Sequence, residues 1–332
     1  MKFAWDKIKR PIICLAPMAG FTDSAFRQIA KKIAPEIICF SELTSINAIA
    51  HNSEKTLKML EFSETEQPLI MQFFGNDTEI FIKAAKTLEK SGASGGIDIN
   101  MGCPAPKVTK NCYGSALLEH PDKAAKIVET LSKNTSLPVS VKIRIGYQSY
   151  NEEKFKKIIK MLESAGAKAI TIHGRTTKQG YSGKADFTPI YLAKETLKIP
   201  VIGNGDITST EEALNKLKSP DGKITLDGLM IGRATIGNPW ILKNIYNTVH
   251  NLEKIQKTHP TPLSFAKKLP TIKKHFKLAL KIHGEKIGLL EMRKHLGGYI
   301  SGIPNASIYR SEIFKEENPE KVLTLLEKFA KL

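Results

Sequence analysis

The segment "PVSVKIRIG" (residues 138–146) carries the first clear sign of the fold of this chain. It is a short run rich in β-branched residues, which indicates a strand. A helical pattern follows from about Glu152 to Ala165, and a second such run, "AITIHG" (169–174), comes next. A strand, a helix and another strand in this order indicate a βαβ unit with parallel strands.

The same unit recurs along the first 240 residues. Most of the runs are apolar on both faces, which is typical of parallel strands covered by helices. Together with the two above, the runs that we interpret as strands number eight: "IICLAP", "IICFSEL", "PLIMQFFG", "GGIDINMG", "PVIGNGDI" and "LDGLMIGRA". Eight strand–helix units of this length predict a (β/α)8 TIM barrel, an α/β fold. The rival, a doubly wound open sheet, would usually carry a G-x-G-x-x-G turn after an early strand, and this chain has none.

The pattern changes after Pro239, because no further strand-like run follows. We therefore expect two domains, a catalytic barrel over residues 1–244 and a small all-helical domain over 245–332. Residues 251–300 carry 11 Lys/Arg and 3 Asp/Glu, in a chain of net charge +17. Such a field attracts a polyanion such as nucleic acid, and a merely solubilising lysine-rich surface is the alternative.

Composition limits the compartment and the cross-links. No apolar stretch is long enough to span a membrane, and the short run after the basic N-terminus contains two prolines and no cleavage site, so we reject a signal peptide. The four cysteines form no C-x-x-C pair, which argues against a disulfide framework and a metal site. We expect a cytoplasmic protein without bound metal or membrane contact, and a monomer.

Polar residues interrupt the apolar pattern where each strand ends, and the carboxyl ends of barrel strands meet at one rim. The glycine-containing segments "GNGDI" and "GRATIGNPW" lie after the last two strands and let backbone N–H groups approach a phosphate. This pattern favours a mononucleotide cofactor such as FMN, or a phosphorylated substrate. Lys142 suits the electron-rich edge of a flavin, and a Schiff-base lysine is the alternative. Gln72 and His173 are further candidates for that edge, or else satisfied structural residues.

The motifs "APMAGFTD", "QFFG", "NMGCP", "GSALL", "VKIRIG", "IHGRT", "NGDI" and "IGRATIGNPW" occur in one order over residues 11–240. In this order and spacing the chain resembles the tRNA-dihydrouridine synthases, most of all the bacterial B type. The pair "NMGCP" and "HGRT" is the most specific part of the likeness. The resemblance implies FMN-dependent reduction of the C5–C6 double bond of a uridine in tRNA, expected in the D-loop, with NADPH as the reductant.

The resemblance also implies roles for individual residues. Cys103 matches the catalytic cysteine, and Asn100 and Arg144 match positions that hold the target uracil; Arg175 is expected to contact the substrate with them. The positions that would bind FMN are Pro17, Met18, Ala19, Gln72, Lys142, His173, Asn204, Gly205, Asp206, Gly232 and Arg233.

The chemistry of uracil suggests what Cys103 does. The flavin would deliver a hydride to C6, and a thiol on the other side of the base would protonate C5 as a general acid. Pro104 biases Cys103 towards extended backbone, which keeps its sulfur away from a helix N-terminus that would favour the thiolate. Plain packing of Cys103 is the alternative. For the whole chain two rivals stay open: a flavin reductase of a free pyrimidine, like dihydroorotate dehydrogenases, and a non-catalytic RNA-binding barrel.

Overall fold

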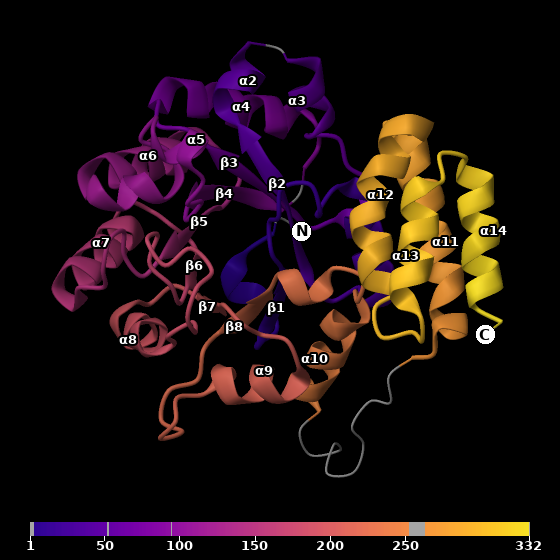
Figure 1. Ribbon diagram of the computed structural model, residues 1–332. Helices are drawn as coiled ribbons and strands as arrows, with labels where there is room; N and C mark the ends of the chain where they lie inside the picture. Colours follow the sequence, from indigo (N-terminus) through magenta and orange to yellow (C-terminus); the bar gives the residue numbers. More distant parts are fainter. Residues whose placement is uncertain (1–2, 52, 94, 252–262, 332) are drawn as a thin grey trace.

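The structure, a computed structural model, describes residues 3–51, 53–93, 95–251 and 263–331. A closed barrel of parallel strands, in the order β1 to β8, forms its larger part (Figure 1). The strands are β1 (Ile12–Leu15), β2 (Ile38–Ser45), β3 (Leu69–Phe74), β4 (Gly96–Met101), β5 (Val139–Arg144), β6 (Ile170–His173), β7 (Val201–Asn204) and β8 (Gly228–Ile231). The TIM-barrel prediction is confirmed.

Each strand pairs with the next, and β8 pairs with β1, where Ile12 faces Gly228, so the sheet has no free edge. Among the described strands, the pairing of β2 with β3 contains a register shift between Phe40 and Leu43. Glu42 falls inside this irregularity, and its carboxylate accepts a hydrogen bond from the backbone N–H of Gly20 at the barrel mouth. A bulge thus helps to direct a polar side chain towards the functional end of the barrel.

Helices cover the outside of the barrel, and several begin at a residue whose side chain caps the helix. Asp23 accepts from the N–H of Phe26 at the start of α1, and Asp77 caps α4 in the same way. The helices of this layer are α1 (Ser24–Ile33), α2 (Ile46–Ala50), α3 (Glu54–Lys58), α4 (Thr78–Lys90), α5 (Pro106–Thr109), α6 (Pro121–Asn134), α7 (Glu152–Ser164), α8 (Thr188–Thr196), α9 (Thr210–Leu217) and α10 (Trp240–His250), with the 3-10 turns η1 (Trp5–Lys7), η2 (Glu64–Glu66), η3 (Gly114–Glu119) and η4 (Arg233–Thr235).

The amino-terminal end of the barrel is closed by side chains. Trp5 is buried against residues of the barrel interior, among them Ile12, Phe40 and Met230. Cys14 and Cys39 lie fully buried on β1 and β2, and burial raises the pKa of Cys39 to about 12. These two thiols are therefore inert, and an open site is left to the opposite end, where the strands end.

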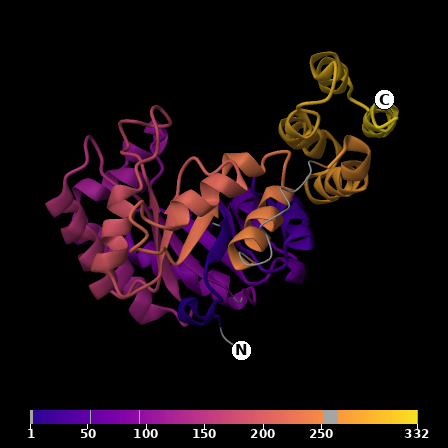
Figure 2. The ribbon, with the colours of Figure 1, turned by 90° about the horizontal axis from the view of Figure 1, so that it is seen from below.

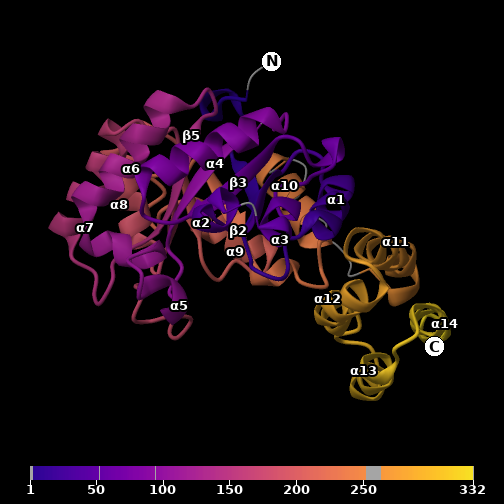
Figure 3. The ribbon, with the colours of Figure 1, turned by 90° about the horizontal axis from the view of Figure 1, so that it is seen from above.

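A second group of helices stands to one side of the barrel in all views (Figures 2 and 3). It consists of α11 (Phe265–His283), α12 (Glu285–Tyr299), α13 (Ala306–Lys315) and α14 (Pro319–Phe329), and it has a core of its own around Phe276, Leu296 and Leu326. The expected domain boundary at 244/245 falls inside α10, which packs on α1 and α9 of the barrel. Across the described ranges, no helix is both long and apolar enough to cross a membrane.

The helical bundle meets the barrel through close backbone contact. Gly237, in the loop after β8, lies against Gly298 of α12, and a Cβ at Gly237 would come within 2.2 Å of the carbonyl carbon of Gly298. Nearby, the ring of His295 packs on Phe26 of α1, and His283 is 2.7 Å from a carboxylate oxygen of Asp23. The contact therefore depends on the absence of side chains at two glycines and on histidines from α11 and α12.

Candidate active site

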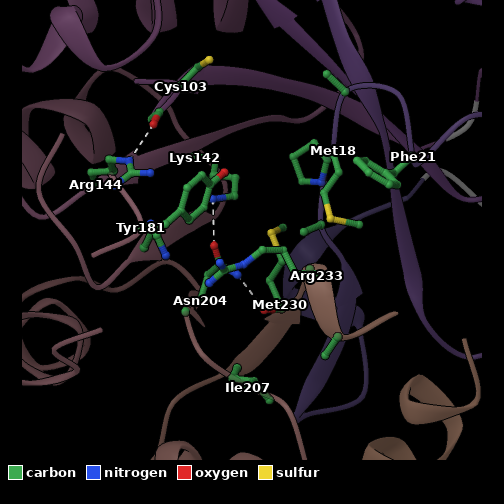
Figure 4. Close-up of a pocket in the computed structure, with 18 of the residues that line it drawn as sticks. Met18, Phe21, Cys103, Lys142, Arg144, Tyr181, Asn204, Ile207, Met230 and Arg233 are labelled. Atoms are coloured by element: carbon green, nitrogen blue, oxygen red, sulfur yellow. Dashed lines mark hydrogen bonds between the residues drawn. The ribbon is translucent and has the colours of Figure 1, made fainter. Parts of the chain in front are cut away.

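A pocket of about 470 Å³ opens at the carboxyl ends of the strands (Figure 4). Of the residues predicted for the site, Gln72 and Arg175 are not among those lining it. The predicted residues that line the pocket are Pro17, Met18, Ala19, Asn100, Cys103, Lys142, Arg144, His173, Asn204, Gly205, Asp206, Gly232 and Arg233. The fold thus brings together residues from six different strand ends.

Cys103 lies in a turn immediately after β4 and is half-buried. The side-chain oxygen of Asn100 accepts hydrogen bonds from the N–H of Gly102 (3.2 Å) and from the N–H of Cys103 (2.9 Å). On the other side, the carbonyl of Cys103 accepts from the backbone N–H and the hydroxyl of Ser115, in η3. The backbone that carries the thiol is therefore held on both sides, at the wall of the pocket.

Gln72 lies beneath this turn, fully buried in the barrel. Its Nε2 donates to Asp98 (2.7 Å), and its Oε1 accepts from Nδ2 of Asn100 (2.7 Å). Ser140 of β5 donates to the second oxygen of Asp98. Sequence reasoning missed Asp98, although an acidic residue inside the apolar run "GGIDINMG" was a signal that could have identified it.

Lys142 projects from β5 into the pocket, where its Nζ donates to Oδ1 of Asn204 (3.0 Å). The amide of Asn204 is fixed in turn, since its Nδ2 donates to the carbonyl of Met230. Burial, followed by the nearby positive charge of Arg144, lowers the pKa of Lys142 to about 8. The ammonium group thus faces the pocket with the neutral amide of Asn204 as its hydrogen-bond partner among the described residues, which suits an anionic or electron-rich ligand.

Arg144 stabilises the loops around the pocket. Its Nε donates to the carbonyl of Gly102, and its Nη1 donates to the carbonyls of Thr176 and Gly180. The neighbouring ring of Tyr181 lies 5.9 Å from the guanidinium carbon of Arg144 and 4.6 Å from that of Arg233 (Figure 4). Tyr181 is 61% exposed, and sequence reasoning missed it because a lone tyrosine in a loop carries no positional signal.

His173 ends β6 and Arg175 follows it in the next loop, and the two side chains face different surroundings. Burial, together with the positive charges of Lys142, Arg144 and Arg175, lowers the pKa of His173 to about 2, so its imidazole is neutral. Arg175 is buried and makes a two-point contact with the carboxylate of Asp206, at 2.9 and 2.7 Å. It also donates to two carbonyls of the loop that carries Tyr181. In this geometry Arg175 joins the loop after β7, which carries Asp206, to the loop that carries Tyr181, and does not itself line the pocket.

The ends of β7 and β8 form a cradle at one side of the pocket. Gly205 has φ +127°, and a Cβ there would come within 2.6 Å of Ala185 and 3.1 Å of His173, so only glycine fits. Asp206 follows in a left-handed conformation, which its contacts with Arg175 and with the N–H of Ala185 stabilise. Arg233 is 57% exposed at the same edge; its Nη2 lies 3.3 Å from Oδ1 of Asp206, and the rest of its guanidinium is accessible to an anion.

The β1–α1 loop, residues 16–23, forms the opposite wall. Met18 and Phe21 line the pocket, while the backbone of the loop is bound from behind by the helical domain. Nζ of Lys294 donates to the carbonyl of Gly20 (2.9 Å), and Nε2 of His295 lies 3.2 Å from the carbonyl of Phe21. The helical domain therefore supports one wall of the pocket directly.

A (β/α)8 barrel with a pocket at the carboxyl ends of its strands belongs to the class of barrel enzymes, whose active sites lie at this end. Residues 14–332 match the sequence model of the family described as dihydrouridine synthase (Dus). The chain belongs to the dihydrouridine synthase family.

Named relatives agree with this assignment. The chain is 37% identical to the probable tRNA-dihydrouridine synthase of Rickettsia conorii, over 96% of this chain and 92% of that protein. It is 35% identical to tRNA-dihydrouridine synthase B of Pasteurella multocida, over 96% and 93%, and 33% identical to tRNA-dihydrouridine synthase B of Xanthomonas campestris, over 95% and 91%. The resemblance to this family and to its B type, expected from the motifs, is confirmed.

Proposed function

We propose that this chain is a tRNA-dihydrouridine synthase that reduces the C5–C6 double bond of a uridine in tRNA, with FMN bound in the pocket and NADPH as the reductant. The observation that carries the proposal is the composition of the pocket, which combines Cys103 after β4 with the glycine-containing loops after β7 and β8. Membership of the dihydrouridine synthase family and the names of the relatives support it.

The pocket has the donor set that a phosphorylated flavin needs. Arg233 and the glycine backbone at Gly205 would hold the phosphate. Among the described residues, the backbone N–H groups of Arg233 and Ala234 have no hydrogen-bond acceptor, which leaves them available as donors. Lys142, His173 and Asn204 would contact the polar edge of the ring, while Pro17, Met18 and Ala19 would pack against it. When bound and reduced by NADPH, FMN supplies a hydride for C6 of the uracil.

Cys103 supplies the remaining proton. Addition of a hydride at C6 places negative charge on C5 and on the conjugated O4, so C5 takes up one proton and the base gains two electrons and two hydrogens. The thiol of Cys103 donates this proton and is reprotonated from solvent through the open pocket. Asn100 and Arg144 would orient the uracil; Nε and Nη1 of Arg144 are used by backbone carbonyls, so Nη2 is the atom available to the base.

The helical domain supports tRNA as the substrate. Helix α11 carries six lysines and no acidic residue. Lys274 on α11 lies close to Lys32 on α1, and the positive charge of Lys32 lowers the pKa of Lys274. Two ammonium groups from different domains, side by side, form a favourable place for a phosphate backbone. Lys273 and Lys294, in contrast, are engaged with Glu327 and with the carbonyl of Gly20.

The activity is tested with the purified protein and an unmodified tRNA transcript. We expect a yellow protein from which FMN is released on denaturation, and dihydrouridine at a defined position after addition of NADPH, mapped by mass spectrometry. A protein without flavin that forms no dihydrouridine would refute the proposal. Reduction of free uracil or orotate without reduction of tRNA would favour the free-pyrimidine alternative.

The role of α11 is tested by charge reversal of Lys274, Lys277 and Lys281, three exposed lysines on one helix. We expect tRNA affinity to fall by roughly tenfold or more at low salt, with unchanged flavin content. A matched control reverses the exposed Lys154, Lys157 and Lys160 of α7, which lies on the far side of the barrel (Figure 1). Equal tRNA affinity of the two triple variants would show that α11 does not bind RNA.

A further inference from the structure

A continuous chain of side-chain hydrogen bonds runs beneath the pocket, from β5 to the turn that carries Cys103. Ser140 donates to Asp98 (2.7 Å), Gln72 donates to the other oxygen of Asp98 (2.7 Å), and Asn100 donates to Gln72 (2.7 Å). Asn100 then accepts from the backbone N–H groups of the turn. All four side chains are buried, so water does not compete for these bonds.

This chain of hydrogen bonds has a direction, because the amide groups of Gln72 and Asn100 each have a donor end and an acceptor end. An ionised Asp98 only accepts, so Gln72 must present Nε2 to it and Oε1 to Asn100. Asn100 must then present Nδ2 to Gln72 and Oδ1 to the turn. The N–H groups of the turn can only donate, so they require the same orientation from the other end. Asp98 at one end and the N–H groups of the turn at the other therefore require the same orientation of the Gln72 and Asn100 amides.

We propose that Asp98 is a positioning residue for Cys103: by accepting from Gln72 it fixes the orientation of Gln72 and Asn100, and through them the backbone of the Cys103 turn. The consequence for catalysis rests on the proposed function, in which the thiol protonates C5. Burial raises the pKa of Asp98 to about 6, so the group is still mainly ionised at pH 7.5. Its negative charge also favours the ammonium form of Lys142, which is a separate effect that the test must distinguish.

The Asp98→Asn variant separates the effect of hydrogen-bond direction from the effect of the negative charge of Asp98. In Asp98→Asn the new amide oxygen can accept from Gln72 and its NH2 group can donate to Ser140, whose hydroxyl can turn towards the carbonyl of Ile97. The direction of the hydrogen bonds is preserved while the negative charge at position 98 is lost. In Asp98→Ala the acceptor is lost and the amide of Gln72 is free to rotate. We expect the first variant to keep the turn and the second to loosen it.

Asn100→Asp provides an opposite test that does not depend on the folding of Asp98→Ala. A carboxylate at position 100 still accepts from the N–H groups of the turn, but it places an acceptor oxygen against Oε1 of Gln72. If the amide of Gln72 rotates, its Oε1 instead faces the carboxylate of Asp98, so two acceptors still meet. Adding Asp98→Asn resolves it, because the new NH2 group donates to Gln72, whose own Nε2 then donates to the carboxylate at position 100. Asp98→Asn should be nearly neutral alone and stabilising in the Asn100→Asp background.

The measurements are made on the full-length purified chain. We expect the melting temperature of the double variant to exceed that of Asn100→Asp by about 5 °C. Amide hydrogen exchange at Gly102 and Cys103 should be at least about tenfold faster in Asp98→Ala than in the wild type, and within about twofold of it in Asp98→Asn. A double variant no more stable than Asn100→Asp, or exchange in Asp98→Ala as slow as in the wild type, overturns the proposal.

The activity measurement separates this proposal from the proposed function. With tRNA and NADPH, Asp98→Ala should reduce uridine more slowly by roughly tenfold while its flavin is reduced by NADPH at the wild-type rate, and Asp98→Asn should recover most of the uridine reduction. Equal losses in the two variants would assign the effect to the charge on Lys142 and overturn the positioning role. A wild-type chain without activity would refute the proposed function, while the exchange and melting measurements would still decide the role of Asp98.

Discussion

Replacing Gly237 with alanine tests whether the barrel and the helical domain form one rigid unit. Gly237 has φ +69°, and a Cβ at this position would lie 2.2 Å from the carbonyl carbon and 2.4 Å from the Cα of Gly298. Both contacts are with the backbone of α12, which cannot rotate away as a side chain would. The helix must therefore move by about 1 Å to reach an ordinary separation.

The magnitude follows from two separate costs. A left-handed conformation costs an alanine about 1–2 kcal/mol, and overpacking of a rigid contact costs about 1–3 kcal/mol. Gly237→Ala should therefore destabilise the chain by about 2–5 kcal/mol. Gly222 is a matched control, because its φ is +72° and no atom lies within 4 Å of a Cβ added there. Gly222→Ala should show the conformational cost alone.

The assay is urea denaturation of both variants, together with limited proteolysis and uridine reduction in tRNA. We expect Gly237→Ala to unfold at a lower urea concentration than Gly222→Ala, to be digested faster by a protease, and to lose uridine reduction while its flavin is still reduced by NADPH. Equal unfolding midpoints for the two variants would refute the argument that the barrel and α12 are in fixed contact.

Three further predictions concern side chains of the pocket and of the domain contact. Cys103→Ala should retain flavin and its reduction by NADPH but reduce uridine roughly 10²–10⁴-fold more slowly, and normal turnover would exclude the general-acid role. Because the pKa of Lys142 is about 8, FMN affinity of the flavin-free chain should fall as the pH rises above about 8, and Lys142→Met should lose this pH dependence; the same dependence in the variant would contradict the assignment. Burial lowers the pKa of His275 to about 3 and the pKa of His295 to about 4. Below about pH 6.5 the unfolded chain therefore binds protons that the folded chain does not. The melting temperature should fall between pH 6.5 and pH 4 for this reason. His283 acts in the opposite sense, because its hydrogen-bonded carboxylate raises its pKa, so His283→Asn should show a steeper fall; a shallower one would reverse the sign.

Side-chain partners in the barrel could not be predicted from the sequence. Gln72 lies within β3 and Arg175 follows β6, yet the structure pairs them with carboxylates, the buried Asp98 and the half-buried Asp206. Each pair joins residues at least 26 positions apart, so the contact depends on the stagger of neighbouring strands. The loop residue Tyr181 likewise reaches Arg233 only because β6 and β8 end at the same rim.

The sequence by itself determined the barrel and the place of its site. Apolar runs of strand length, alternating with capped amphipathic helices, specify parallel strands covered by helices, and the closed order of those strands brings Cys103, Lys142 and Arg233 to one rim. Only the tertiary structure decided the direction of the hydrogen bonds that run from Asp98 to the Cys103 turn, and the backbone contact between α12 and Gly237. Hydrophobic periodicity records which face of an element is buried, whereas hydrogen-bond direction and backbone contact depend on how elements distant in sequence meet.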